Sequence, residues 1–470
     1  MLFTDRQFFL FFAVVFAIYW LLRVNWARKG LLLVASYGFY AAWDYRFLTL
    51  ILLSTIVNHE SAQRIHATSD RRSRLLWLLG VVTYNIGVLF YFKYLNFFID
   101  SFVGFLGLFG VMSKPGAWEI ILPVGISFYT FHGMSYPLDV YHRNLEPRRQ
   151  WLDFAIFMSF FPQMLAGPIV RASEFLPQLA VIRSWKDVRV SLCLVWFVIG
   201  FTKKAAISDP IAIHVDRIFA DPHAYATWDI MQGQILYAIQ IYCDFSGYSD
   251  MALATAGLLG YTLPRNFNFP YLATNISEFW RRWHMSLSRW LHDYLYLPLY
   301  FLGENRSQMM IYRNLVITML MCGLWHGAAW GFVVFGILHG GSLILHQEWQ
   351  RFCRRHKLVI PFWRVIATVV TFVWVSWTLV YFRAPDVQVA WYLTVGTFFS
   401  QQPAQATLAL NGPWIVAILA VVHGSFQRWQ LDQWLARRGE ITLAVLLGVW
   451  MAISTACMPT EYRPFIYFQF

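Results

Sequence analysis

Long apolar runs alternate with short polar stretches along the whole chain. Several of these runs approach the roughly 20 residues that a helix needs to cross a bilayer. The candidate spans are Phe8–Leu22, Leu31–Ala42, Phe47–Val57, Leu75–Phe92, Phe97–Met112, Ile120–Tyr136, Phe154–Val170, Val188–Phe201, Ile230–Leu259, Gln308–Leu324, Ala328–Leu345, Val365–Tyr381, Val389–Phe399, Trp414–Val422 and Leu443–Cys457. The pattern predicts an all-α polytopic membrane protein.

Some of these runs are short or interrupted, as in LPVGISFYTFHGMSYP from Leu122 to Pro137. Broken helices at membrane depth are tolerated only where they are buried in protein or line a cavity. We therefore expect roughly 11 to 13 transmembrane helices, with the other runs re-entrant or interfacial, around a central cavity. No repeat or linker divides the chain, so residues 1–470 are expected to form a single domain.

The composition agrees with a membrane protein. Hydrophobic residues make up 58% of the chain and charged residues 13%, whereas about a quarter of an average soluble domain is charged. The net charge is +12, and the basic residues cluster between apolar runs, as in juxtamembrane anchoring. No long basic face is available for nucleic acid, so the lipid bilayer is the expected partner and nucleic acid is not.

Basic loops also predict the orientation of the chain, because Lys and Arg are enriched on the cytoplasmic side. Arg28 and Lys29 mark one cytoplasmic loop, and the stretch 64–74 marks the next. The N-terminus then lies outside. The stretch 351–357, which carries three arginines and a lysine, is a further cytoplasmic signal.

Metal and cofactor motifs are not found. The five cysteines are scattered without a CxxC pair, so neither a zinc site nor a disulfide framework is indicated. Walker, Rossmann and HEXXH patterns do not occur either. We expect no metal and no bound cofactor.

A segment unlike its surroundings runs from Pro264 to Gly303. Large apolar residues recur in it at helical spacing, with basic residues among them, which is typical of a helix in the membrane interface. Asn275 or Ser277 is a candidate cap at the start of this helix. For Arg281 and Arg289, a role as surface anchors stays open.

Three polar features could carry chemistry. His326, in CGLWHGAAWG, lies between two apolar runs, where an ionisable side chain usually faces a cavity. The glycines and alanines around it let backbones or a ligand approach closely. The alternative is an interfacial histidine at a tight turn, with Trp325 and Trp330 as interface residues.

His284, in WRRWHMSLS, is the second feature, and by itself it fits an interfacial side chain equally well. The third is the polar cluster CDFSGYSD, which is too dense for a lipid-facing helix and should face the interior. A hydrogen-bond network between helices is favoured for Asp250. The role of Asp244 stays open.

Several stretches resemble the membrane-bound O-acyltransferase family, in the bacterial branch of the alginate O-acetylation type. They are FFPQMLAGPIVRASEFLPQL, YCDFSGYSDMALATAGLLGY, RNFNFPYLATNISEFWRRWHMSLSRWLHDYLYLPL, LWHGAAWGFVVFGILHG and PFIYFQF. The resemblance implies that His326 is the catalytic histidine. It also maps His284 onto a second polar position, which is Asn in many eukaryotic members and His in this branch.

The resemblance implies transfer of an acetyl or other acyl group from a thioester, acetyl-CoA or an acyl carrier, to an exported polysaccharide such as alginate. It implies a bacterial inner-membrane, multi-pass location. A transporter or channel subunit that hands the acyl group to a separate periplasmic transferase is the alternative.

Such a reaction needs a base for the hydroxyl proton and charge stabilisation for the oxyanion. His326 would act as base or relay the acyl group, and His284 would position the donor. Arg281 and Arg282 would meet anionic groups of the donor. The further candidates for binding substrate or donor are Asp244, Asn275 and Trp325.

Charge and length also predict where the two histidines lie. Gln308–Leu324 would carry the chain outward and Ala328–Leu345 would return it to the basic stretch 351–357. This places His326 toward the outer half of the membrane and His284 nearer the cytoplasmic side. A channel through the protein would then bridge the gap between them.

Overall fold

The computed structural model describes residues 1–111, 120–165, 167–302, 307–357, 362–399, 406–408, 410–460 and 463–466. Within these ranges the structure is helical and has no strand, apart from an isolated bridge between Tyr225 and Ala406. The chain forms two compact units. One comprises Met1–Arg189 and Thr255–Pro264, and the other Val190–Ala254 and Arg265–Phe470. That they act as a single domain stays a prediction.

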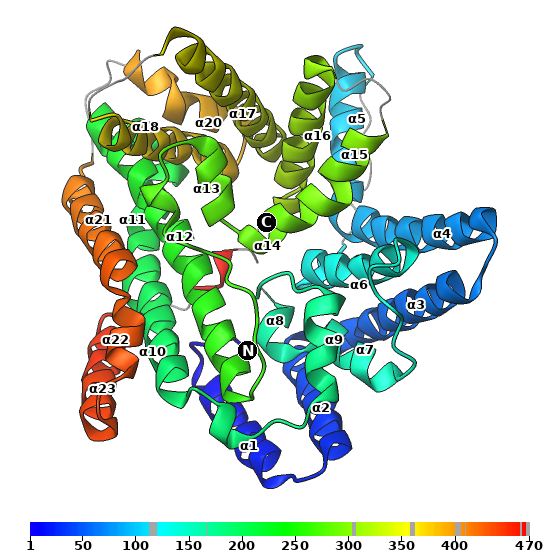
Figure 1. Cartoon of the computed structure of the whole chain (residues 1–470). Coiled ribbons are helices and arrows are strands. Elements are labelled where there is room, and N and C mark those ends of the chain that lie inside the picture. Colours follow the sequence, from blue (N-terminus) through cyan, green and yellow to red (C-terminus); the bar gives the residue numbers. More distant parts are fainter. Residues whose placement is uncertain are drawn as a thin grey trace. The chain divides into compact units, whose positions relative to one another are not determined.

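The first unit is a set of helices in which α3, α4 and α6 lie side by side (Figure 1). Its α-helices are α1 Arg6–Leu21, α2 Asn25–Asp44, α3 Leu48–Ala67, α4 Arg71–Leu89, α5 Leu95–Gly107, α6 Ile126–Tyr141, α7 Trp151–Ser159, α8 Phe161–Met164 and α9 Ala172–Ala180. Buried polar pairs hold them together. Asn58 and Asn85 exchange hydrogen bonds between α3 and α4, and Lys29 pairs with Asp153 at 2.6 Å between α2 and α7.

The interrupted run from Leu122 to Pro137 becomes helical only at Ile126. Gly125, just before it, has a φ of 75°, and a Cβ there would lie 2.7 Å from the carbonyl oxygen of Met164. Only glycine suits this left-handed position against a neighbouring backbone. The α6 helix that follows is almost entirely buried, as expected for a broken helix inside the protein.

The second unit contains the remaining longer helices. They are α10 Val190–Phe201, α11 Asp209–Ala220, α12 Thr227–Leu258, α13 Ile276–Arg282, α14 Met285–Leu291, α15 Leu297–Phe301, α16 Gln308–His326, α17 Trp330–His356, α18 Trp363–Thr378, α19 Val380–Arg383, α20 Val387–Thr394, α21 Gly412–Trp429, α22 Leu431–Ala436 and α23 Glu440–Ala456. The last four residues of α12 belong to the first unit. A π-helical stretch, η4 Thr202–Ser208, joins α10 to α11.

Helices α16 and α17 form a closely packed hairpin (Figure 1). Glycines make this approach possible. A Cβ on Gly323 would lie 2.2 Å from the carbonyl oxygen of Phe332, and one on Gly336 would lie 2.6 Å from that of Met319. The prediction that small residues around His326 admit a neighbouring backbone is therefore confirmed at Gly323.

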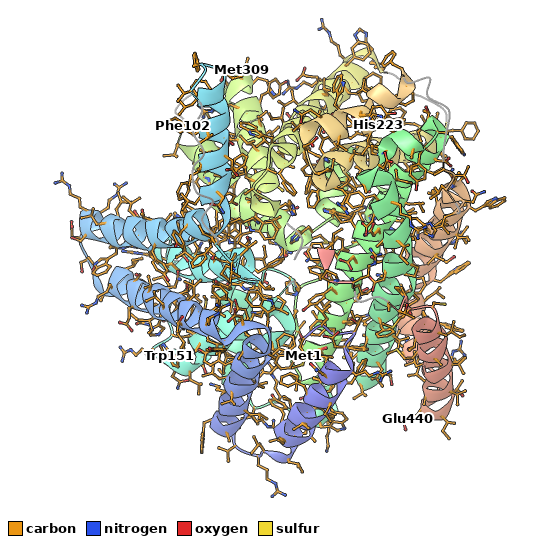
Figure 2. All side chains as sticks on the ribbon, turned by 180° about the vertical axis from the view of Figure 1, so that it is seen from behind. Met1, Phe102, Trp151, His223, Met309 and Glu440 are labelled. Atoms are coloured by element: carbon orange, nitrogen blue, oxygen red, sulfur yellow. The ribbon has the colours of Figure 1, made fainter. Side chains whose placement is uncertain are left out.

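Three helical segments of the described structure are long and apolar enough to cross a membrane: Arg71–Gly107, Val190–Ala220 and Trp363–Arg383. Two shorter apolar helices are α1 and α23. On α23, every fourth residue from Ile441 to Ile453 is more than half exposed, so an apolar stripe faces outward from its start at Glu440 (Figure 2). Such a stripe suits contact with lipid. The expected number of spans stays a prediction.

Some expected spans are not single helices. The run Phe154–Val170 breaks at Phe160 between α7 and α8, because Pro162 cannot continue the hydrogen-bond ladder of α7. The run Val389–Phe399 contains only part of the short helix α20. Parts of other expected segments, Met112, Ala166, Gly303 and residues 467–470 of the PFIYFQF tail, lie outside the described residues.

Candidate active site

His326 is the last residue of α16, and its side chain is only 3% exposed. The chain leaves the helix at Gly327, where a Cβ would overlap the ring of Phe332. The ring of Phe382 packs edge-on against the imidazole of His326, with the centroids 5.0 Å apart. The hairpin turn thus holds His326 inside the protein, and not at the surface as the interfacial alternative would require.

His284 lies at a sharp break between α13 and α14, with a φ of 42°. The single interfacial helix expected through this segment is therefore wrong. The amide of Asn266 stabilises the break, because its Oδ1 accepts hydrogen bonds from the backbone N–H of Ser286 at 3.3 Å and from the Ser286 hydroxyl at 2.9 Å. The break turns His284 fully inward, where it has no exposed surface.

The two histidine rings lie next to each other, with centroids 6.1 Å apart. The ring of Trp325 contacts both, at 5.0 Å from His326 and 5.5 Å from His284. Phe245 of α12 packs edge-on against His284 at 4.7 Å. The expectation that the histidines lie at different depths, with a channel between them, is wrong because the break at His284 brings this side chain to the end of α16.

Hydrogen bonding fixes the tautomer of His284. Its Nδ1 lies 3.1 Å from Asn266 Oδ1, which already accepts from Ser286, so Nδ1 carries the hydrogen and donates. His284 lies in the connection between two seven-residue helices, outside the candidate spans. Burial lowers the pKa of His284 to about 3, so the imidazole is neutral at pH 7.

A cavity of about 450 Å³ lies close to His284 and His326. Its wall includes Met285, which follows His284, and Cys322, one helical turn before His326. Arg281 and Arg289 also line it, together with apolar side chains from α13, α14, α16 and α17. The structure therefore brings Arg281 to the cavity, and it adds Arg289, for which the sequence left a surface anchor open.

Arg282 is not among the residues that line the cavity. It pairs with Glu278 at 2.8 Å and donates to the carbonyl oxygen of Asn268. Asn275 caps α13 by accepting from the backbone N–H of Glu278 at 2.8 Å, which confirms the predicted start signal. Burial raises the pKa of Glu278, but hydrogen bonds from Thr274 and Arg282 outweigh it and leave that pKa below its usual value.

The tryptophans of this segment are buried. Trp280, Trp283 and Trp290 are each less than 9% exposed. They therefore do not face lipid as surface anchors, because they pack against the second unit's other helices, and the location of this segment at the membrane interface stays a prediction. A helical aromatic periodicity alone does not separate these two surroundings.

Asp244 belongs to a buried charge cluster. Lys204 of η4 lies 2.5 Å from Asp244 and 2.8 Å from Asp209. The second carboxylate oxygen of Asp244 accepts from the backbone N–H of Ile466 at 2.7 Å. These contacts account for burial of Asp244 without a ligand, and its role in binding donor or substrate stays a prediction. Asp250 pairs with Lys203 at 2.6 Å, as expected for a link between helices.

The segment 463–466 packs next to the site, although none of its residues was predicted as a site residue. Phe465 is fully buried against Tyr248 and against Phe245, the residue that contacts His284. Arg463 pairs with Asp216, which also binds Arg383 at 2.8 Å. The aromatic PFIYFQF motif was a usable signal, whereas nothing in the sequence marked Asn266.

The site contains no recognisable metal centre: within the described ranges, no three His, Cys, Asp or Glu side chains are grouped to hold an ion. What the fold does assemble is a pair of adjacent buried imidazoles, with an arginine-lined cavity close to them. Imidazole suits the removal of a hydroxyl proton near neutral pH. An all-α membrane protein with this site is suited to transfer a group to a hydroxyl.

Comparison with known proteins agrees with that class. A family model for the membrane-bound O-acyltransferase family matches residues 147–383. The chain is 41% identical to a probable alginate O-acetylase AlgI of Azotobacter vinelandii, over 85% of this chain and 78% of that protein. It is 35% identical to a peptidoglycan O-acetyltransferase of Helicobacter pylori, over 82% of this chain and 77% of that protein. The chain belongs to the membrane-bound O-acyltransferase family and is an O-acyltransferase.

Proposed function

We propose that the protein transfers an acetyl or related acyl group from a cytoplasmic thioester, across a bacterial inner membrane, to hydroxyls of an exported polysaccharide. The observation that carries this proposal is the pair of buried histidines, 6.1 Å apart, close to a cavity lined by Met285 and Cys322, their near neighbours along the chain. The relatives named for alginate and peptidoglycan support a polysaccharide acceptor. Alginate or a similar polymer is the favoured acceptor, because an alginate relative in Pseudomonas putida matches over the full length of both chains.

In the proposed reaction, a ring nitrogen of His326 takes the proton of the acceptor hydroxyl. The hydroxyl oxygen attacks the acyl carbon, and the carbon–sulfur bond of the thioester breaks. The thiolate leaves and takes up the proton from His326, so ester and free thiol are the products. His284 is held neutral by burial and donates from Nδ1 to Asn266, which leaves its Nε2 as an acceptor with which to position the donor.

The cavity size supports a donor with an arm longer than an acetyl group. Its volume of about 450 Å³ is within the roughly 300–1,000 Å³ of sites for drug-sized molecules. Its apolar wall suits a flexible thioester arm, and Arg281 and Arg289 at its lining suit phosphate groups. Acetyl-CoA and an acyl carrier both have such an arm, and we propose acetyl-CoA as the donor.

The direct test uses purified protein in liposomes, with acetyl-CoA labelled in the acetyl group and an oligosaccharide acceptor such as oligomannuronate. Release of CoA with label on the oligosaccharide is expected. His326→Ala should abolish both, and His284→Asn, which keeps the left-handed backbone favourable, should slow turnover less severely. His66→Ala, at an exposed position on α3, is the matched control.

Two other outcomes would change the proposal. Label that stays on the protein until a periplasmic transferase is added would favour the subunit that hands its acyl group to a separate partner. Normal acetylation by a well-folded His326→Ala variant would contradict the assigned base and with it the mechanism.

A further inference from the structure

A third histidine, His339 on α17, is fully buried beside the cavity wall. It is not among the residues that line the cavity, and it is 13 residues away from His326 along the chain. A buried ionisable side chain that does not meet the substrate needs another explanation, because its polar atoms must be satisfied inside the protein. The contacts of His339 supply one.

The hydrogen bonds of His339 determine which of its two ring nitrogens carries the hydrogen. The indole N–H of Trp280 can only donate, so His339 Nδ1, at 3.2 Å, must accept. The neutral ring then carries its hydrogen on Nε2 and donates to Thr378 Oγ1 at 3.0 Å. Thr378 in turn donates to the carbonyl oxygen of Val375. The chain of bonds links α13, α17 and α18.

This hydrogen-bond chain ends at the cavity, because Trp280 is part of its wall. On its other face, His339 is connected to His326 through packed aromatic rings. Phe335 lies 4.3 Å from His339 and 5.6 Å from Phe382, and Phe382 lies 5.0 Å from His326. One buried side chain therefore contacts both the cavity wall and the packing around the base.

We propose that His339 is a positioning residue for the acyl donor: its Nδ1 holds the indole of Trp280 as a fixed wall of the cavity. His339 thereby sets donor affinity more than it sets the rate of the chemical step. The use of this cavity by the donor rests on the proposed function, whereas the control of its shape by His339 does not. The proposal assigns His339 no contact with the reacting atoms.

Two substitutions separate the two hydrogen bonds. In His339→Asn, the amide oxygen stands at the place of Nδ1 and can still accept from Trp280. In His339→Gln, the amide reaches the place of Nε2 and keeps the bond to Thr378, but it leaves the Trp280 N–H without its acceptor. Trp280→Phe removes the same bond from the other side and keeps an aromatic ring in the wall.

We expect His339→Gln and Trp280→Phe each to raise the KM for acetyl-CoA by about tenfold, with kcat changed less than about twofold. The double variant should have a KM no higher than either single variant, because both substitutions remove the same hydrogen bond between Trp280 and His339. His339→Asn should stay within about threefold of the wild-type KM. Equal KM and kcat losses in His339→Asn and His339→Gln, with equal loss of thermal stability, would show a merely structural role and overturn the proposal.

A second readout does not depend on the donor. Cys322 lines the same cavity, so its reaction rate with a small methanethiosulfonate reagent reports the cavity's shape when the other four cysteines are replaced by serine. His339→Gln should change this rate several-fold, and His339→Asn should not. An unchanged rate in His339→Gln contradicts the proposal. If the wild type does not use acetyl-CoA, the proposed function fails, while this measurement still tests His339.

Discussion

Neighbouring residues in the segment Ile276–Arg282 have different surroundings, although the sequence suggests similar roles. Arg281 lines the cavity and bonds to Ser277, whereas Arg282 is held by Glu278 outside it. Consecutive residues on a helix differ in direction by about 100°. Both arginines could be predicted as donor contacts from the sequence, but their division of roles required the position of the cavity.

Arg281→Ala should therefore raise the KM for acetyl-CoA more than Arg282→Ala, by roughly 5- to 20-fold, because an arginine–phosphate bond is charge-assisted. Arg282→Ala is the matched control and should leave donor KM nearly unchanged. Steady-state kinetics with varied donor and saturating acceptor give the comparison. Equal effects of the two variants, or an effect on acceptor KM alone, would contradict the donor role of Arg281.

The W-H-G surroundings of His326 resemble a known family and predict it as the base, which stays a prediction, whereas the local sequence left a cavity-facing and an interfacial histidine both open. The inward orientation of His284 was not predictable. Helical periodicity continues through Trp283 into Leu287, and a left-handed residue in such a pattern has no local sequence signal other than the tolerance of histidine for positive φ. The amide that stabilises it, Asn266, is 18 residues away.

At the scale of the elements, the α16–α17 hairpin determines where His326 lies. Its glycines bring the two backbones into contact over the half of α16 nearest the histidine. The sequence indicated this close approach, since small residues flank His326. It could not indicate which glycine faces the other helix, because that depends on the rotation of each helix about its axis.

Gly323→Ala should weaken both stability and activity. The added Cβ would lie 2.2 Å from the carbonyl oxygen of Phe332, so the helices must separate next to His326, at an expected 1–3 kcal/mol. Gly341→Ala on α17 is the matched control, because nothing lies within 4 Å of its Cβ, and it should be neutral or slightly stabilising. Unfolding in detergent and acetyl transfer measure the two effects. A Gly323→Ala variant as active as Gly341→Ala would contradict this account of the hairpin.

The π-helical stretch η4 also has a role that can be tested. It presents two adjacent lysines to different partners: Lys204 to the buried Asp209 and Asp244, and Lys203 to the less buried Asp250. Lys204→Met should lower stability by about 3–5 kcal/mol, because it leaves buried carboxylates without their counter-ion. Lys203→Met should lower it less, since that pair is partly exposed. Detergent unfolding compares them, and equal losses would contradict the assigned burial effect.

At the scale of the whole molecule, the all-α membrane class was predictable from apolar runs and low charge, and most long helices fall where those runs are. The expected count of roughly 11 to 13 spans stays a prediction. The helix α6 has only 16 residues and buries polar side chains such as His132 and Asp139, so an apolar run in the sequence does not by itself separate a spanning helix from an internal one.

Orientation can be tested on the hairpin itself. Met309, labelled in Figure 2, is 73% exposed at the first turn of α16. Trp330 is 56% exposed at the start of α17, next to the turn at the other end of the hairpin. The basic stretch 351–357 lies at the Met309 end, where Arg351 bonds to Gln308. In a cysteine-free protein, an impermeant thiol reagent in the periplasm should label Trp330→Cys and spare Met309→Cys. The reverse pattern would invert the topology.

The contact between Asp244 and Ile466 joins residues 222 positions apart. A ribosome that adds about 5–20 residues per second needs roughly 11 to 44 s to make the intervening chain. During that time α12 has already been synthesised, while Phe465, which packs against Phe245, the neighbour of His284, has not. A nascent chain therefore carries the earlier helices without the finished packing beside His284, which is completed only after this late segment has been translated and docked.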